Sequence, residues 1–247
     1  MAVIPHPFSN QPVTHWIALF SDAESAEERL RALQAIGLLG SAEEVNRLAQ
    51  QGLTDADSTV RAAAAKLLGT PGPLDAGAAE TPLTMLLEDE DPDTRFEAAR
   101  ALVRRKSPQQ AKAVQTLFSF LGEEETQPLM VAATVDAVVE ADELSASDLE
   151  RFLPLLESRF ETERGEVREA VAAAFVRWPG LCEKVIEKLL PLLDDSEPIV
   201  RERTAVALGK AGNSDPRVIE GLETAAKDED SEVARVAQES LQKLIAK

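Results

Sequence analysis

The residues that could carry metal or nucleophilic chemistry are few and widely separated in the sequence. His6 and His15 are the two histidines, and Cys182 is the one cysteine. A nucleophile–base pair would need Cys182 beside one of these histidines, and a metal site would need several such ligands close together. Neither spacing is present, so the sequence predicts no catalytic residue, no metal site and no cofactor.

The charged residues of the sequence indicate which kinds of partner the chain can bind. The chain has 44 acidic and 26 basic residues, which gives a net charge of −18 at pH 7. Such a charge repels nucleic acid and anionic lipid on average. Acidic residues are concentrated between positions 123 and 169, where fourteen of them accompany four arginines. We therefore expect a protein partner, and neither a nucleic acid nor a membrane.

Further sequence features bear on where the chain works. No apolar run approaches 18 residues, so no membrane-spanning helix is predicted. The N-terminus has no basic segment followed by an apolar one, so no secretory signal is predicted. A single cysteine fits a reducing compartment. The expected location is cytoplasmic, and the sequence does not indicate the oligomeric state.

A recurring string of residues organises nearly the whole chain. The segment from Asp195 to Gly209 is similar to the segment from Asp55 to Gly69, and in both a Val-Arg pair is followed by small residues and then by Leu-Gly. Such self-similarity indicates an array of stacked helix pairs. The position of the arginine, here termed the anchor, recurs at residues 29, 61, 95, 130, 168, 201 and 234.

Each repeat is expected to contain a helix A, a short turn and a helix B that carries the anchor. Ser41 and Glu44 have capping-box spacing at the start of a helix. Proline after a capping residue, as at Asp215, also predicts a helix start, and the same pattern occurs at Thr81. Gly212 has the position of a helix stop.

The Asp-turn-Val-Arg-x-x-Ala-Ala-x-x-Leu-Gly string resembles HEAT repeats, especially the short bacterial HEAT-like form first described in phycobilisome lyases. The resemblance implies an all-α fold, a right-handed α-α superhelix (α-solenoid) of about seven helix pairs. It also implies that the anchor arginines bond to turn aspartates or carbonyls as a structural ladder. Departures are Met130 and Ala234 in place of arginine. We expect an N-terminal arm over 1–11 and one repeat domain over 12–247, with repeats at roughly 12–40, 41–72, 78–106, 107–141, 145–178, 180–212 and 214–247.

Helical geometry assigns faces to helix B, because each residue advances about 100° around the axis. Positions −1, +3, +4 and +7 from the anchor lie together, and they hold apolar or small residues such as Val200 and Leu208. This is the predicted packed face. Positions +2, +5 and +9 lie opposite, on the side that the resemblance implies is concave. Of these 21 residues, eight are basic and two acidic.

Two explanations fit this basic strip. Cations near helix C-termini are favoured by the helix dipole. Alternatively, the strip is a groove for an acidic segment of a partner, with Ala132, Val135 and Val139 as an apolar contact. The predicted partner-binding residues are Arg100, Arg104, Val135, Val139, Arg177, Arg203 and Lys210.

The sequence therefore predicts a non-catalytic protein-binding scaffold or adaptor that recognises its partner through the second helices. An accessory, lyase-type or chaperone-type factor acting on another protein is an alternative that would use the same kind of surface. A HEAT-like DNA glycosylase is a weaker alternative, because the strip holds no tryptophan or tyrosine to stack on a base.

Overall fold

The structure is a computed structural model that describes residues 8, 10–70, 76–122, 126–141, 144–162 and 164–246, with no side chains described at 76–78. Several features discussed above lie outside the described residues. These are His6 and most of the predicted arm over 1–11, residues 71–75 of the loop between repeats two and three, and the acidic residues at 123–125 and 142–143.

Helix accounts for 77% of the chain, and the described residues contain no strand. The A helices are α1 (Val13–Asp22), α3 (Ala42–Gly52), α5 (Ala76–Met85), α7 (Gln110–Gly122), α9 (Ala146–Glu157), α11 (Ile186–Leu189) and α13 (Pro216–Ala225). The B helices are α2 (Ala26–Leu39), α4 (Ser58–Leu68), α6 (Pro92–Arg104), α8 (Pro128–Val139), α10 (Gly165–Arg177), α12 (Pro198–Ala211) and α14 (Ser231–Ile245). Short 3-10 turns cover Leu86–Glu88, Pro179–Lys184 and Leu190–Asp194.

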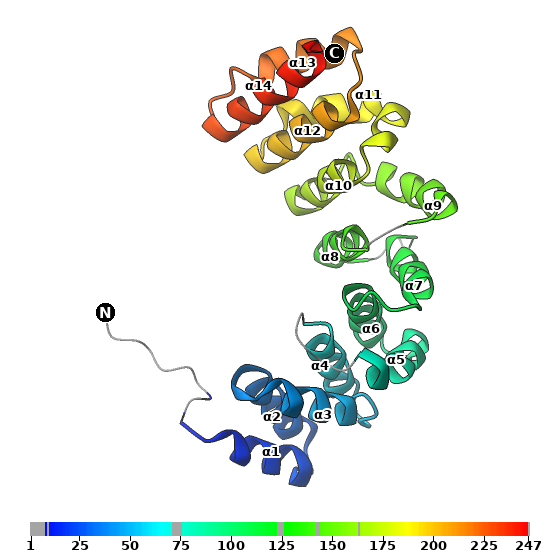
Figure 1. The fold of residues 1–247 in the computed structure, drawn as a ribbon, viewed down its shortest axis with the longest axis vertical. Coiled ribbons are helices and arrows are strands. Elements are labelled where there is room, and N and C mark those ends of the chain that lie inside the picture. The colour runs from blue at the N-terminus through cyan, green and yellow to red at the C-terminus, as the bar shows by residue number, and fades with distance from the viewer. Residues whose placement is uncertain are drawn as a thin grey trace. The chain divides into compact units, whose positions relative to one another are not determined.

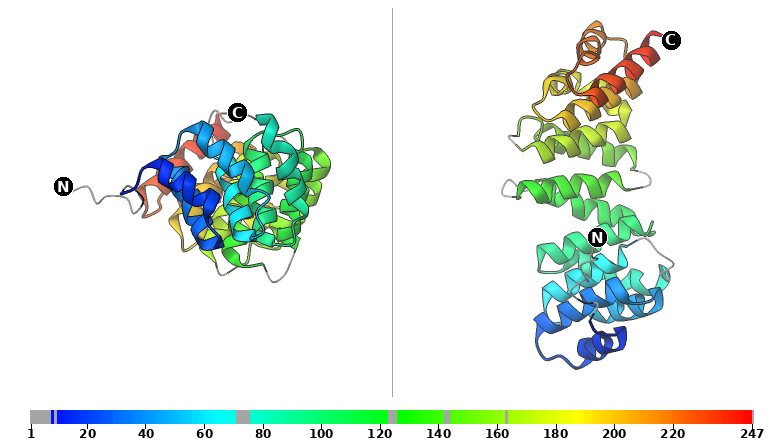
Figure 2. Two further views of the ribbon diagram at one scale, coloured as in Figure 1. Left: turned by 90° about the horizontal axis from the view of Figure 1, so that it is seen from below. Right: turned by 90° about the vertical axis from the view of Figure 1, so that its left-hand side faces the viewer.

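The chain divides into two compact parts. The N-terminal part comprises residues 1–117 and 140–142, and the C-terminal part comprises residues 118–139 and 143–247. In the N-terminal part α2 packs on α4 and α4 on α6, and in the C-terminal part α8, α10, α12 and α14 pack in the same serial manner (Figures 1 and 2). Each part is therefore a stack of helix pairs. The single repeat domain over 12–247 stays a prediction.

The packed face of the B helices is the predicted one. Val60, Ala64, Ala65 and Leu68 of α4 have no exposed surface, and the matching residues of α12 are equally buried. Among the latter, the Thr204 hydroxyl donates to the carbonyl of Val200 at 2.8 Å, so its polar atom is satisfied within the helix. Small residues at +3 and +4 allow the neighbouring helices to approach, and stacking buries a stripe that one helix pair would leave exposed.

Repeat four departs from the predicted register by one residue. In the other B helices the anchor lies four residues after the N-cap, as Arg61 follows Asp57. The α8 helix begins at Pro128, and the Val131 amide donates to the carbonyl of Gln127, so the N-cap is at 127 and the anchor is Val131, not Met130. Thr134, Val135 and Val138, at +3, +4 and +7 from Val131, are fully buried. Repeat four has no arginine at its anchor position, so its sequence alone did not fix the alignment with the other repeats.

Most predicted helix boundaries are confirmed. Ser41 and Glu44 form a capping box, and Gly212 ends α12 in the left-handed conformation with φ 69°. The start predicted at Thr81 is wrong, because Pro82 lies inside α5. Buried Ala79 and Leu83 lie four residues apart on this helix, so packing of both turns carries the helix through the proline.

Helix A of repeat six is broken into short pieces. The segment contains two 3-10 turns around the four-residue helix α11. Pro191 follows directly after Leu190, the C-cap of this helix, and a proline has no N–H to continue the α-helical hydrogen bonds. The periodic sequence of this segment did not reveal the break.

Candidate protein-binding surface

The anchor arginines form the ladder that the family resemblance implied. In four of the five, the guanidinium donates two hydrogen bonds to the aspartate of the following turn, at 2.5 to 2.8 Å, and also donates to carbonyls of its own turn. Two-pronged pairing of this kind is geometrically specific. Arg95 donates to the carbonyls of Asp89 and Glu90 in its own turn. The four two-pronged pairs are Arg29–Asp55, Arg61–Asp89, Arg168–Asp195 and Arg201–Asp228.

These pairs shift the pKa values of their members in opposite directions. The hydrogen bonds from Arg29, Arg61 and Arg201 hold the pKa of the partner aspartates below the ordinary value. The same bonds raise the pKa of the arginines. Because Arg201 and Asp228 are only 9% and 10% exposed, both charges depend on the pairing. The four pairs therefore have a structural role, and their charged groups are already engaged.

One rung of the ladder is missing in the C-terminal part. Val131 occupies the anchor position of repeat four. Thr162 occupies the place of the aspartate in the next turn, two residues before the N-cap Arg164. Both charged groups of the rung are absent together, so no buried charge is left without its partner.

The surface opposite the packed face, here termed the B-helix face, comprises positions −2, +2, +5 and +9 of the B helices. In the N-terminal part its predicted site residues are Arg100 and Arg104. Arg100 lies 3.5 Å from a carboxylate oxygen of Glu97 and over the ring of Phe96. Arg104 donates two hydrogen bonds to Glu140, at 2.5 and 2.7 Å. Both predicted cations of this part are thus engaged with carboxylates of the same chain.

The C-terminal part differs in this respect. Arg177 is exposed and lies over the ring of Trp178. Arg203 is half-buried, and its Nε is shielded from solvent without an acceptor among the described residues. Lys210 is exposed, and its Nζ lies 3.5 Å from the carbonyl of Val176. Within the described residues neither Arg203 nor Lys210 has a carboxylate partner.

The apolar contact predicted in repeat four is wrong. Val135 has no exposed surface and Ala132 is buried, so neither side chain can contact a partner, while Val139 is half-buried. The cause is the register shift described above. With the anchor at Val131, positions +2, +5 and +9 are Ala133, Asp136 and Glu140, and the last two are exposed acids.

Position −2 of the B helices was missed in the sequence analysis, although it lies about 160° from the anchor on the same face. It brings exposed acids to the N-terminal ends of these helices: Glu27, Asp93, Glu166 and Glu232. Position +9 lies eleven residues later, about 16 Å along the helix, and holds a cation in the repeats of α6, α10, α12 and α14, whereas the other repeats have Leu38, Thr70 and Glu140 there. The B-helix face thus has an acidic edge and a basic edge, an arrangement that the helix dipole also favours.

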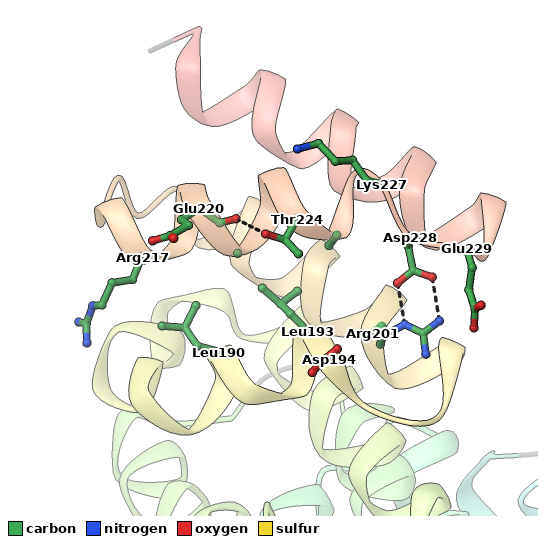
Figure 3. Close-up of a pocket in the computed structure, with 12 residues that line it drawn as sticks. Leu190, Leu193, Asp194, Arg201, Arg217, Glu220, Thr224, Lys227, Asp228 and Glu229 are labelled. Carbon is green, nitrogen blue, oxygen red and sulfur yellow. Dashed lines mark hydrogen bonds and ion pairs between the residues drawn. The ribbon is translucent and has the colours of Figure 1, made fainter.

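A groove that the sequence did not predict lies between α13 and the 3-10 turn Leu190–Asp194, and has a volume of about 660 Å³ (Figure 3). Leu190, Leu193 and Ala225 contribute its apolar lining. The Arg201–Asp228 rung lies at one end, and Arg217 is paired with Asp215 and Glu187. Arg201 and Asp228 are thus engaged with each other, and Arg217 is engaged with carboxylates outside the lining, so the groove is interpreted as a packing groove between two repeats.

Among the residues that the structure describes, those that could perform nucleophilic or metal chemistry are not assembled in a site. Cys182 is buried, and burial raises the pKa of its thiol to about 12, so it is not a thiolate near neutral pH. Among the described residues no group of three or more potential ligands could hold a metal ion. No described helix is long and apolar enough to cross a membrane.

The stacked helix pairs define the chain as an α-solenoid. The family model for HEAT repeats matches residues 51–134, 79–176 and 154–242, so the chain belongs to the HEAT-repeat family. No curated protein sequence is significantly similar to it.

Three solved structures with similar folds have low sequence identity to this chain. The Escherichia coli protein YibA has a TM-score of 0.64 at 18% identity, over 97% of this chain and 94% of that protein. A designed armadillo repeat protein has a TM-score of 0.56 at 18% identity, over 94% of this chain and 99% of its own length. A mutant of Kap121p reaches 0.64 at 14% identity, over 95% of this chain and 29% of its own length. At these identities the similarity shows the fold alone.

Proposed function

We propose that this chain is a non-catalytic scaffold or adaptor that recognises a protein partner through its B-helix face. This proposal rests on the observation that the B-helix face is built from equivalent positions on successive helices. On successive B helices the same positions are directed away from the packed side, so their side chains form a continuous surface within each part. A surface built by repetition suits a ligand that is itself extended.

The charge of the face supports a protein as that ligand. An acidic edge and a basic edge run beside each other, whereas a nucleic acid presents one sign of charge along its whole length. The chain as a whole carries −18, which further disfavours a polyanion of that kind. A polypeptide can present both signs and apolar groups in one segment.

Other proteins of this fold offer a precedent. The designed armadillo repeat proteins with this fold were made for modular peptide recognition. Stacked helices provide such recognition because each repeat contributes side chains at a fixed spacing. The buried thiol of Cys182 and the occupied ladder leave side-chain recognition as the chemistry that this surface offers.

The test is photo-crosslinking in cells with a photoreactive amino acid at one position at a time. Lys66 and Lys210 report on the B-helix face, and Arg47 and Lys188, which are also exposed, report on the A helices. We expect the two B-helix positions to crosslink to protein and the two A-helix positions to give no defined adduct. Adducts from the A-helix positions alone, or adducts to nucleic acid, would show the proposed function to be wrong.

A further inference from the structure

Three cations on the B-helix face of α12 and α14 have no carboxylate partner among the described residues. They are Arg203, Lys210 and Lys243. Arg203 is half-buried with its Nε shielded from solvent, and the remaining N–H groups of its guanidinium can donate to an incoming acceptor. This differs from the N-terminal part, where Glu97 and Glu140 engage the predicted cations.

The acids near these cations are held elsewhere. Glu232 and Glu239 of α14 both pair with Arg235, and Asp228 accepts from Arg201. The described acids nearby are thus paired with Arg235 or Arg201, and not with Arg203, Lys210 or Lys243.

The spacing of the basic edge indicates what fits it. Arg177, Lys210 and Lys243 occupy the same position on α10, α12 and α14, which pack side by side (Figure 1). Axes of packed helices lie about 8–10 Å apart. A polyproline II segment rises about 3.1 Å per residue with three residues per turn, so side chains three residues apart share a face at about 9 Å spacing.

Apart from Arg203 and Glu239, positions +2 and +5 of α10, α12 and α14 hold small apolar residues. Ala173 and Val206, at position +5 of α10 and α12, are half-buried, and Ala170 and Val236 are buried at +2. Short aliphatic side chains of this kind leave room for a backbone to lie across the helices. Arg203 stands among them and can donate to a backbone carbonyl or to a carboxylate.

We propose that the row Arg177, Lys210 and Lys243, together with Arg203, binds an extended acidic segment of a partner protein whose carboxylates recur at every third residue. This inference rests on the proposed function. It adds which part of the chain binds the partner, the negative charge of the bound segment and the spacing of its carboxylates. Electrostatic complementarity of exposed groups supplies selectivity and a dependence on salt.

The experiment uses the full chain and a fluorescently labelled twelve-residue peptide with Glu at every third position and Pro, Ser and Gln between them. A second peptide has the same composition with its glutamates contiguous. Fluorescence anisotropy should show binding of the first peptide and about tenfold weaker binding of the second. The K210E/K243E variant should bind the first peptide about 100-fold more weakly, because two attractions become repulsions.

The matched control is K184E/K227E, which makes the same charge change at exposed lysines of the C-terminal part that lie off the B-helix face. It should bind within about twofold of the unaltered chain, and circular dichroism should show unchanged helix in both variants. Equal binding by K210E/K243E, equal binding of the two peptides, or tighter binding of a single-stranded oligonucleotide would overturn the inference. If no acidic peptide binds while B-helix crosslinks to protein persist, the inference fails and the proposed function stands.

Discussion

Arg104 of the N-terminal part and Lys210 of the C-terminal part occupy the same position, +9, on their B helices, yet differ in what they contact. In the N-terminal part Arg100 and Arg104 are engaged by Glu97 and Glu140. In the C-terminal part Arg203 and Lys210 have no carboxylate partner among the described residues. A basic residue at a repeated surface position is therefore available to a ligand only where neither its own helix nor a neighbouring segment presents an acid to it.

The largest expected loss of stability comes from the packed face of the B helices, which both parts share. Leu68 and Leu208 occupy position +7 of α4 and α12, and neither has exposed surface. Replacing either by Ala should lower the free energy of unfolding by about 2–5 kcal/mol, because each leaves a cavity in a stack that cannot collapse freely. Urea denaturation of the two variants measures this loss.

Lys66→Ala and Lys210→Ala provide the controls, since both lysines are exposed on the opposite face. Either should leave the urea midpoint nearly unchanged. A loss confined to one part would show that the two stacks are not packed alike.

The ladder provides the next largest effect. Arg201→Ala should lower the free energy of unfolding by about 2 kcal/mol at pH 7, because it leaves Asp228 with a reduced set of charged hydrogen bonds. The pKa of Asp228 is lowered in the folded state by Arg201, so this contribution is present above the ordinary aspartate pKa and is lost as the pH falls through the lowered value.

The difference between Arg201→Ala and the unaltered chain should therefore shrink when denaturation is measured below about pH 4. Arg235→Ala is the comparison, because Arg235 pairs with Glu232 and Glu239 at the exposed surface. Exposed pairs contribute little. A similar loss for both arginines would contradict the structural role of the ladder.

A smaller effect is expected when the carboxylates that engage Arg100 and Arg104 in the N-terminal part are removed. In the K210E/K243E background, Glu97→Gln with Glu140→Gln should strengthen binding of the spaced acidic peptide about tenfold, because Arg100 and Arg104 lose their carboxylate partners. Burial raises the pKa of Glu97, so an uncharged residue is tolerated there. Anisotropy measures the gain.

Glu43→Gln with Glu90→Gln makes the same charge change at exposed acids of the N-terminal part. These substitutions should have little effect on peptide affinity. A gain equal to that of the first pair would mean that net charge, rather than the release of two arginines, controls binding.

The smallest effect concerns the missing rung. Val131→Arg alone should destabilise the chain, because Val131 is 2% exposed and the new charge has no partner. Adding Thr162→Asp should recover about 1 kcal/mol, the scale of a hydrogen-bonded pair. A double-mutant cycle in urea measures this coupling. No coupling would show that the turn of repeat five does not follow the geometry of the other turns.

Sequence periodicity was sufficient for the repeats that carry an arginine anchor. The Val-Arg string placed α4 and α12 and their buried residues correctly, since small side chains at +3 and +4 are required wherever helices stack. The same reasoning failed at repeat four, where Val131 replaces arginine and the alignment slipped to Met130. A slip of one residue rotates every assignment by about 100°, which exchanged buried Val135 for exposed Asp136.

The sequence by itself determined the helix pairs, the packed face and the sign of the basic edge, because these depend on local spacing along one helix. Tertiary structure decided which charges meet. Arg104 and Glu140 are 36 residues apart, and Arg201 and Asp228 are 27 apart. Such pairs depend on how neighbouring repeats are offset, and a charge pair forms or fails within a few ångströms. Only the stacked helices therefore distinguish Arg104, which pairs with Glu140, from Lys210, which has no carboxylate partner among the described residues.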